Sequence, residues 1–174
     1  MTGERLTERL RLVPIRVEHA DDLWKLHQEP GVADYWGAWS REDALRNAAH
    51  YVAGWESHGV SKWIAYDRTT GALVGRGGLS RAMVDGEERL EVGWTISGRL
   101  WRRGFATEIG RAGLDFAFDE LDAGEVVAFT ETHNARSIAV MERLGMQYGR
   151  DIVHGGEPFV LYVMSRRDYE RQRG

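Results

Sequence analysis

What the sequence lacks already narrows its function. It contains no cysteine, which excludes disulfides, thiolate metal sites and a cysteine nucleophile. It has no run of roughly eighteen apolar residues, the length that a membrane-spanning helix needs. Its first residues, MTGERLTERLRL, are charged throughout and lack the apolar core of a signal peptide. We therefore expect a cytoplasmic protein that does not associate with a membrane.

The charge balance excludes a second group of functions. The formal net charge is −4, so generic binding to nucleic acid has no electrostatic support at the level of the whole chain. Arg99, Arg102 and Arg103 form a local exception to this balance. None of the six histidines falls in the HExxH spacing of a metal-binding helix, and we expect no metal ion.

The hydrophobic pattern predicts a single domain, residues 1–174, because this length is typical of one domain. Alternation of apolar residues predicts strands, and helical spacing predicts helices. In chain order, the pattern predicts a strand at 8–15, a helix within 16–32 that ends at Pro30-Gly31, an aromatic loop at 35–39, a helix at 40–57, two strands within 62–80 around a turn at 67–71, a hairpin at 82–96 with Asp85-Gly86 at its tip, a helix from about 106 to 121, a strand at 125–130, a helix at 135–145, and one or two final strands that include 158–165.

This order of elements predicts the fold class. Adjacent strands joined by tight turns pair antiparallel, whereas a strand–helix–strand crossover gives a parallel pair. We therefore expect an α+β fold of three layers, with a mixed and mostly antiparallel central sheet and helices on both of its faces.

The segment RLWRRGFATEIGRAGLDFAF, residues 99–118, places two arginines and Gly104 directly before a helix. The first turn of a helix has backbone N–H groups without internal partners, and the helix dipole makes that end positive. A glycine there lets a ligand approach the backbone. The segment therefore fits an anion such as a phosphate, although it is equally compatible with a basic loop that only precedes a helix.

Two further segments contain candidate catalytic groups. In RLEVGWTI, residues 89–96, alternation places Glu91 on the opposite face from Trp94, and Gly93 marks a bulge or a close backbone approach. In THNARSIAVMERLGM, residues 132–146, Asn134 occupies an N-cap position and Ser137 lies one turn inside the helix. Each residue also has an ordinary structural explanation: a solvent-facing glutamate, a helix cap and a packing-neutral serine.

Together these segments resemble the GCN5-related N-acetyltransferase (GNAT) superfamily, in particular the branch that acetylates the N-termini of ribosomal proteins. TERLRLVPI and HADDLWKLHQEPGV resemble the first strand and helix of that branch, LEVGWTI its central strand, LWRRGFATE its acyl-CoA loop and ETHNARSIAVMERLGM its distal strand-to-helix segment. Two positions depart from the general superfamily pattern: Trp101 begins the loop, as is usual in this branch, and Met141 stands near the place of the tyrosine acid.

The resemblance implies a ligand and its contacts. Acetyl-CoA is the expected co-substrate, with its pyrophosphate at the helix head. Its pantetheine arm is expected to pair with the strand ending near Ile96, where that strand splays from residues 125–130. The cofactor-binding residues that the resemblance implies are Trp94, Thr95, Ile96, Arg102, Arg103, Gly104, Phe105, Ala106, Thr107 and Asn134.

The resemblance also implies the chemistry. An amine attacks the thioester directly in a ternary complex, because the chain has no cysteine for a covalent acetyl-enzyme. A protein α-amino group has a free pKa of about 8, so a modest base suffices. Glu91, acting through water, is the candidate base, and a backbone N–H of the predicted bulge is a candidate oxyanion donor. Ser137 is the candidate for positioning the departing sulfur or serving as its acid.

The acceptor remains open at this stage. The branch resemblance favours a protein N-terminus. The aromatic residues Tyr35, Trp36 and Trp39, with acidic residues nearby, alternatively indicate a small cationic amine such as an aminoglycoside or polyamine, or only a hydrophobic plug over the core. A reading of another class is a non-catalytic acyl-CoA-binding module. The acidic residues near the aromatic loop are Glu29, Asp34, Glu42 and Asp43.

For the oligomeric state, we expect a monomer or a homodimer.

Overall fold

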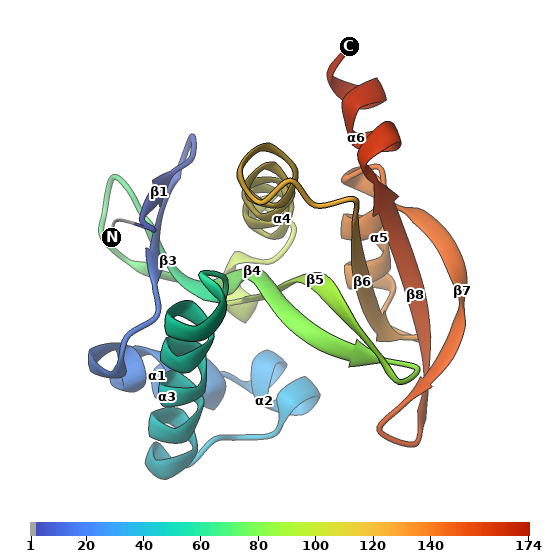
Figure 1. The fold of residues 1–174 in the computed structure, drawn as a ribbon. Coiled ribbons are helices and arrows are strands. Elements are labelled where there is room, and N and C mark those ends of the chain that lie inside the picture. Colours follow the sequence, from blue (N-terminus) through green and yellow to red (C-terminus); the bar gives the residue numbers. More distant parts are fainter. Residues whose placement is uncertain (1–2) are drawn as a thin grey trace.

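Eight strands form one sheet in the computed structural model, which describes residues 3–174 (Figure 1). The strand order is β1-β2-β3-β4-β5-β6-β8-β7, and among the described residues every neighbouring pair is antiparallel except β5–β6. The mixed and mostly antiparallel sheet is therefore confirmed. The strands are β1 Arg5–Leu6, β2 Leu10–Pro14, β3 Lys62–Asp67, β4 Leu73–Val84, β5 Glu87–Ile96, β6 Glu125–Glu131, β7 Gln147–His154 and β8 Glu157–Ser165.

The long β4–β5 hairpin forms the centre of the sheet, and its turn is the predicted one. Asp85 and Gly86 both have positive φ, +50° and +79°, the conformation that a tight two-residue hairpin turn requires. The register runs without a shift from Val84–Glu87 to Gly75–Ile96. The predicted bulge at Gly93 is therefore wrong. Side chains rather than a backbone crowd Gly93: a Cβ there would lie 2.6 Å from the Glu91 carboxylate and 3.2 Å from the Lys62 ammonium.

Strands β5 and β6 separate almost as soon as they meet. Their register consists of the single pair Glu91–Val127, whereas β6 pairs with β8 along its whole length. Beyond Glu91, the side of β5 that faces β6 has no strand partner among the described residues. The splayed parallel pair expected from the sequence is thus present.

Helices cover both faces of the sheet, as predicted (Figure 1). On one face, α4 packs so closely that a Cβ on Gly110 would lie 3.2 Å from Trp94. On the other, α1 and α3 bury Leu23 and Ala48 against Ile64. The helices are α1 Ala20–Gln28, α2 Pro30–Trp36, α3 Arg41–His58, α4 Phe105–Asp115, α5 Ala135–Arg143 and α6 Arg166–Arg173, with 3-10 turns at Val17–His19 and Gly98–Leu100 and a π-helical turn at Phe116–Glu120.

The sequence reading was wrong about the region after α1. Pro30-Gly31 does not lead into an aromatic loop: Pro30 begins a second helix, α2, which contains Tyr35 and Trp36. Proline is tolerated at the first helical position because the N–H it lacks would have no intrahelical partner there. Only Trp39 lies in the loop that follows. A capping box formed by Ser40 and Asp43 starts α3.

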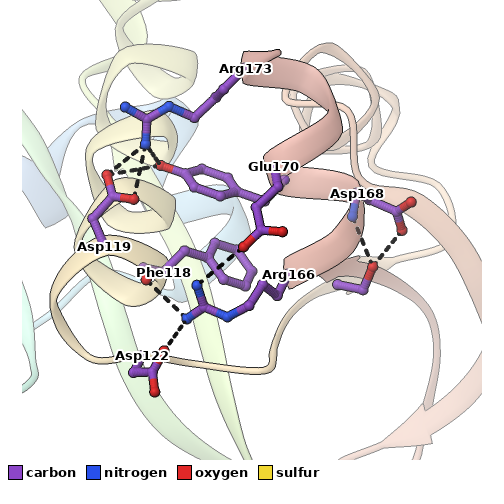
Figure 2. Close-up of polar contacts among 9 residues, drawn as sticks. Phe118, Asp119, Asp122, Arg166, Asp168, Glu170 and Arg173 are labelled. Atoms are coloured by element: carbon purple, nitrogen blue, oxygen red, sulfur yellow. Dashed lines mark hydrogen bonds and ion pairs between the residues drawn. The ribbon is translucent and has the colours of Figure 1, made fainter.

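The C-terminal helix α6, which the sequence reading did not anticipate, is fastened to the turn after α4 (Figure 2). Arg166 donates to the Phe118 carbonyl at 3.0 Å and to Asp122 at 2.8 Å. Arg173 bonds both oxygens of Asp119, and the ring of Tyr169 stacks on Phe118. These contacts join α6 to the segment between α4 and β6.

The close packing of α4 on the hairpin predicts a large difference between two glycine substitutions. In Gly77→Ala the new Cβ would lie 2.7 Å from the Gly93 carbonyl and 2.5 Å from Ile109, and overpacking of this kind costs about 1–3 kcal/mol. Gly124 has open space around it, so Gly124→Ala is the matched control and is expected to be neutral or slightly stabilising. Urea unfolding of both variants measures the difference, and equal stabilities would contradict this account of the packing.

Candidate active site

A cavity of about 1200 Å³ lies where β5 separates from β6. Strands β4, β5 and β6 and helices α2, α3, α4 and α5 all contribute to its walls. Of the site residues predicted from the sequence, all but Arg103 line it: Tyr35, Trp36, Trp39, Glu91, Trp94, Thr95, Ile96, Arg102, Gly104, Phe105, Ala106, Thr107, Asn134 and Ser137. Arg103 lies outside the walls, exposed to solvent, and its carbonyl accepts from Arg9 at 2.8 Å.

The head of α4 is built to receive a ligand. Its N-cap is Gly104, in the left-handed region at φ +83°, and no side chain caps the helix. Arg102 also has a positive φ of +64°. Thr107, in the first turn, has a buried hydroxyl without a hydrogen-bond partner. Free N–H groups, left-handed backbone and an unpartnered hydroxyl together suit a phosphate.

A second cation beside this helix head was missed in the sequence. The guanidinium of Arg136, in α5, lies 3.3 Å from the centre of the Trp101 ring. The indole N–H of Trp101 donates to the Ile96 carbonyl at 2.9 Å, which ties the loop to the end of β5. Trp101 therefore serves as the platform on which Arg136 lies beside the cavity. In the sequence, Arg136 resembles any exposed arginine in the first turn of a helix.

Trp94 and the start of α5 form a polar network on the α4 face of the sheet. The indole N–H of Trp94 donates to the Ser137 hydroxyl at 3.1 Å. Asn134 caps α5 by accepting from the Ser137 N–H at 3.2 Å, and it donates to Thr130 at 3.0 Å. The predicted cap is confirmed. The hydroxyl of Tyr35 also bonds Thr130, at 3.0 Å, so α2 reaches across the cavity to β6.

Glu91 lies on the opposite face and is not solvent-facing. Its Oε2 accepts from the ammonium of Lys62 at 3.0 Å and from Ser80 at 2.7 Å, while Oε1 has no partner among residues 3–174. Lys62 is 7 % exposed, and burial lowers the pKa of its ammonium although Glu91 opposes that shift. The burial of Lys62 could not be predicted from the sequence, because a lysine at the start of a strand is ordinarily exposed.

Arg76 lies on the same face as Glu91, two positions from Gly78 on β4. Its side chain is 5 % exposed in total, and its Nε donates to His27 at 3.3 Å. The ring of Trp39 stacks on His27 with 3.4 Å between centroids. Burial, with Arg76 as the second cause, lowers the pKa of His27 to about 3, so the imidazole is neutral and accepts the bond. Arg76 interrupts the glycine-rich run VGRGGL, the one sequence signal that marks it.

Two of the three aromatic residues predicted to contact the acceptor, Trp36 and Trp39, lie beside this internal cation. The rings of Trp36 and Trp39 lie 5.2 and 5.6 Å from the Arg76 guanidinium. Two of the nearby acids are used within the protein. Glu29 accepts from the Ser97 hydroxyl and the Gly98 N–H, and Asp43 caps α3. The other two acids, Asp34 and Glu42, are exposed, and the charged group that lies against the rings of Trp36 and Trp39 is the cation Arg76.

Residues 3–174 contain neither a candidate metal site nor a candidate membrane-spanning helix. No group of three or more His, Cys, Asp or Glu side chains converges to hold a metal ion. No described helix is both long enough and apolar enough to cross a membrane.

Comparisons with known proteins agree with this geometry. The acetyltransferase (GNAT) domain family matches residues 9–147. The uncharacterized protein YkkB of Bacillus subtilis is 30% identical over 94% of this chain and 95% of its own length. A putative ribosomal-protein-serine acetyltransferase from Vibrio cholerae has a TM-score of 0.77 at 20% identity, covering 95% and 99% of the two chains. The aminoglycoside acetyltransferase AAC(6')-Ib, in complex with coenzyme A and kanamycin, has a TM-score of 0.80 at 20% identity and the same coverage. At these identities the two structures show the fold alone.

The neutral His27 predicts how stability depends on pH. Folding lowers the pKa of His27 from 6.5 to about 3, so the unfolded chain binds the proton more readily. The contribution of the neutral His27 imidazole to the free energy of unfolding is therefore fully present above pH 6.5, and it is lost as the pH falls toward 3. We expect His27→Gln, whose amide oxygen can still accept from Arg76, to lose less unfolding free energy than the wild type between pH 6.5 and about 5. His58→Gln, at an exposed position, is the control, and an unchanged slope in His27→Gln would contradict the prediction.

Proposed function

Because this chain belongs to the GNAT acetyltransferase family and is an acetyl-CoA-dependent N-acetyltransferase, we propose that it moves the acetyl group directly to a primary amine, with Glu91 as base. The observation that carries the proposal is the convergence of two unlike sites on one cavity. The uncapped head of α4 opens into it, and a largely buried carboxylate, that of Glu91, faces it from β5. A nucleotide thioester and an amine can therefore meet where β5 and β6 separate.

The donor is assigned to the helix head and the unpaired side of β5. The N–H groups at the start of α4 receive the pyrophosphate of acetyl-CoA, with Thr107 as a hydroxyl donor and Arg102 and Arg136 as nearby cations. The pantetheine arm pairs with β5 beyond Glu91, where β6 has moved away. Asn134 borders the same gap from the cap of α5.

The base is assigned to Glu91 because one of its oxygens is free. Lys62 and Ser80 both hold Oε2 and so fix the carboxylate. Oε1 remains available to take the ammonium proton through a water molecule, as general base catalysis requires. The neutral amine then attacks the thioester carbonyl, an N–C bond forms, and the C–S bond breaks. The ammonium proton has left through Glu91. The electron pair of the C–S bond leaves with sulfur, and the sulfur takes up the second proton that the nitrogen releases as the amide forms, which gives the free thiol of CoA.

Ser137 is assigned to the departing sulfur as a positioning group. Its hydroxyl accepts from Trp94, so the hydroxyl proton is free to point toward the cavity. A thiol has a pKa of about 8.5, so the leaving thiolate hardly needs an acid at neutral pH. The hydroxyl thus serves mainly to hold the thioester in place. Because β5 has no bulge, an oxyanion donor comes from the unpaired backbone of that strand.

The geometry favours a small-molecule amine over a protein N-terminus as the acceptor. The Tyr35–Thr130 bond joins α2 to β6 over the cavity, and this bridge narrows the space that an extended peptide would need. A protein N-terminus, favoured by the resemblance in sequence, would require this bridge to open. A non-catalytic acyl-CoA-binding module would have no use for the fixed carboxylate of Glu91.

Turnover tests the proposal. The wild type is expected to release free CoA from acetyl-CoA only when an amine is supplied. Glu91→Gln keeps the shape of the side chain and removes its charge, so we expect the rate to fall by about 10² at pH 7 with unchanged acetyl-CoA affinity. The deficit is expected to narrow at high pH, where the amine is already neutral. Glu88→Gln, an exposed position on the same strand, is the control. Full activity of Glu91→Gln would remove Glu91 from the mechanism.

Two helix caps separate a structural role of Asn134 from a ligand contact. Asn134→Ala and Ser165→Ala each remove an N-cap side chain, from α5 and α6 respectively, and each is expected to cost about 1 kcal/mol of stability. Only Asn134→Ala is expected to weaken acetyl-CoA binding as well, because α6 lies away from the cavity. Calorimetric titration measures the affinity of both variants for acetyl-CoA. Retained affinity in Asn134→Ala would leave that residue as a cap alone.

A further inference from the structure

We propose that Arg76, with the hydroxyl of Thr95, binds a carboxylate on the acceptor, so that the acceptor of this enzyme is a small amine that also carries a carboxyl group. This inference rests on the proposed amine acetylation and names the class of amine. It depends on a charge that the fold buries without neutralising it.

Arg76 has no anionic partner in the described part of the chain. Its side chain is 5 % exposed, and its only hydrogen bond there runs from Nε to the neutral His27. The two terminal nitrogens, which form the fork that fits a carboxylate, have no partner among residues 3–174. A buried guanidinium without a counter-ion is costly, and Arg76 lines the cavity. An anionic ligand would supply the missing partner.

The aromatic walls around Arg76 fix its guanidinium without neutralising it. Trp36, Trp39 and Tyr51 lie 5.2, 5.6 and 5.8 Å from it. Stacking on aromatic faces holds an arginine in place while leaving its hydrogen-bond donors unused. The same rings are poorly placed for a cationic acceptor, because the position that a ligand cation would take is occupied by Arg76.

Thr95 provides a second, independent observation. It is the cross-strand partner of Arg76, so the two side chains share one face of the sheet. Thr95 is 7 % exposed, and its hydroxyl is buried without a hydrogen-bond partner. Native proteins rarely leave such a group unpaired. The Thr95 hydroxyl and the terminal nitrogens of Arg76 are adjacent on two strands, both residues line the cavity, and neither group has an acceptor among residues 3–174, so together they form a site for a ligand that brings acceptors.

The rest of the charge on this face shows that the missing group is an anion. Lys62 is the other buried cation of this face, and its ammonium donates to the Glu91 carboxylate and to the Gly78 carbonyl. The pair Lys62–Glu91 is balanced, so Arg76 remains as an excess positive charge. An acceptor carboxylate would balance it, whereas a polyamine or an aminoglycoside would add to it.

The register places the two ends of such an acceptor. Ser80 lies opposite Glu91 and Arg76 lies opposite Thr95. The carboxylate subsite and the base therefore lie four positions apart along β4, about 13 Å along the strand. The long arginine side chain covers part of that distance. An acceptor with its amine at Glu91 and its carboxylate at Arg76 thus needs a spacer between the two groups.

The test compares acids with their amides on the wild-type enzyme. Glycine, β-alanine, 4-aminobutyrate and 6-aminohexanoate are each assayed beside the corresponding amide, with amine-dependent release of CoA as the readout. We expect at least one acid to exceed its amide by roughly tenfold to a hundredfold in kcat/KM, mainly through KM, because a charged hydrogen bond is worth about that factor. Amides that react as well as the acids would overturn the inference and leave the proposed acetyl transfer intact. No amine-dependent release with any acceptor would overturn the proposed function itself.

Variants then assign the preference to Arg76. Arg76→Met is expected to remove the preference for the acid over its amide, and Arg76→Lys to keep part of that preference. Arg81→Met is the matched control, since Arg81 also lines the cavity but is exposed and pairs with Glu88. Acetyl-CoA affinity is expected to be unchanged in Arg76→Met. Loss of that affinity would assign Arg76 to the phosphates of the donor and overturn the inference. If Arg76→Met fails to fold, the comparison on the wild type still decides the question.

Discussion

The separation of β5 from β6 is the constraint on which the rest of the structure depends. Two parallel strands that meet at one residue pair, Glu91–Val127, leave a strand edge unpaired in the middle of a sheet. An unpaired edge normally invites another strand, and here helices α4 and α5 hold the two halves apart. The edge is therefore available to a ligand that can hydrogen-bond with backbone, and a cavity of about 1200 Å³ follows from it.

The two faces of the sheet differ in character at this opening. On the α4 face, glycines allow the helix to pack tightly on the hairpin, and the indole N–H of Trp94 donates a hydrogen bond to the Ser137 hydroxyl. On the opposite face, β3, β4 and β5 each carry a buried or largely buried charge: Lys62, Arg76 and Glu91. Burying charge inside a sheet costs stability, so the presence of Lys62, Glu91 and Arg76 together is difficult to explain by folding alone. It supports our proposal that the acceptor binds on this face.

The comparison of sequence and structure is informative at particular elements. The β4–β5 hairpin was predictable from Asp85-Gly86, since only a few dipeptides suit two successive positive φ values. The caps at Ser40 and Asn134 were predictable because their bonds reach only three residues along the chain. The start of α2 at Pro30 was not, since proline ends one helix and begins another with the same local signal.

The sequence by itself determined which local groups have chemistry to offer: the glycine at the head of α4, the carboxylate of Glu91 and the cap at Asn134. Each depends on neighbours a few residues away, and local patterns record such neighbours. Only the tertiary structure decided what those groups meet. Lys62 reaches Glu91 across 29 positions and Arg76 reaches His27 across 49. Burial and charge pairing arise when distant strands and helices come together, and no spacing along one chain specifies them.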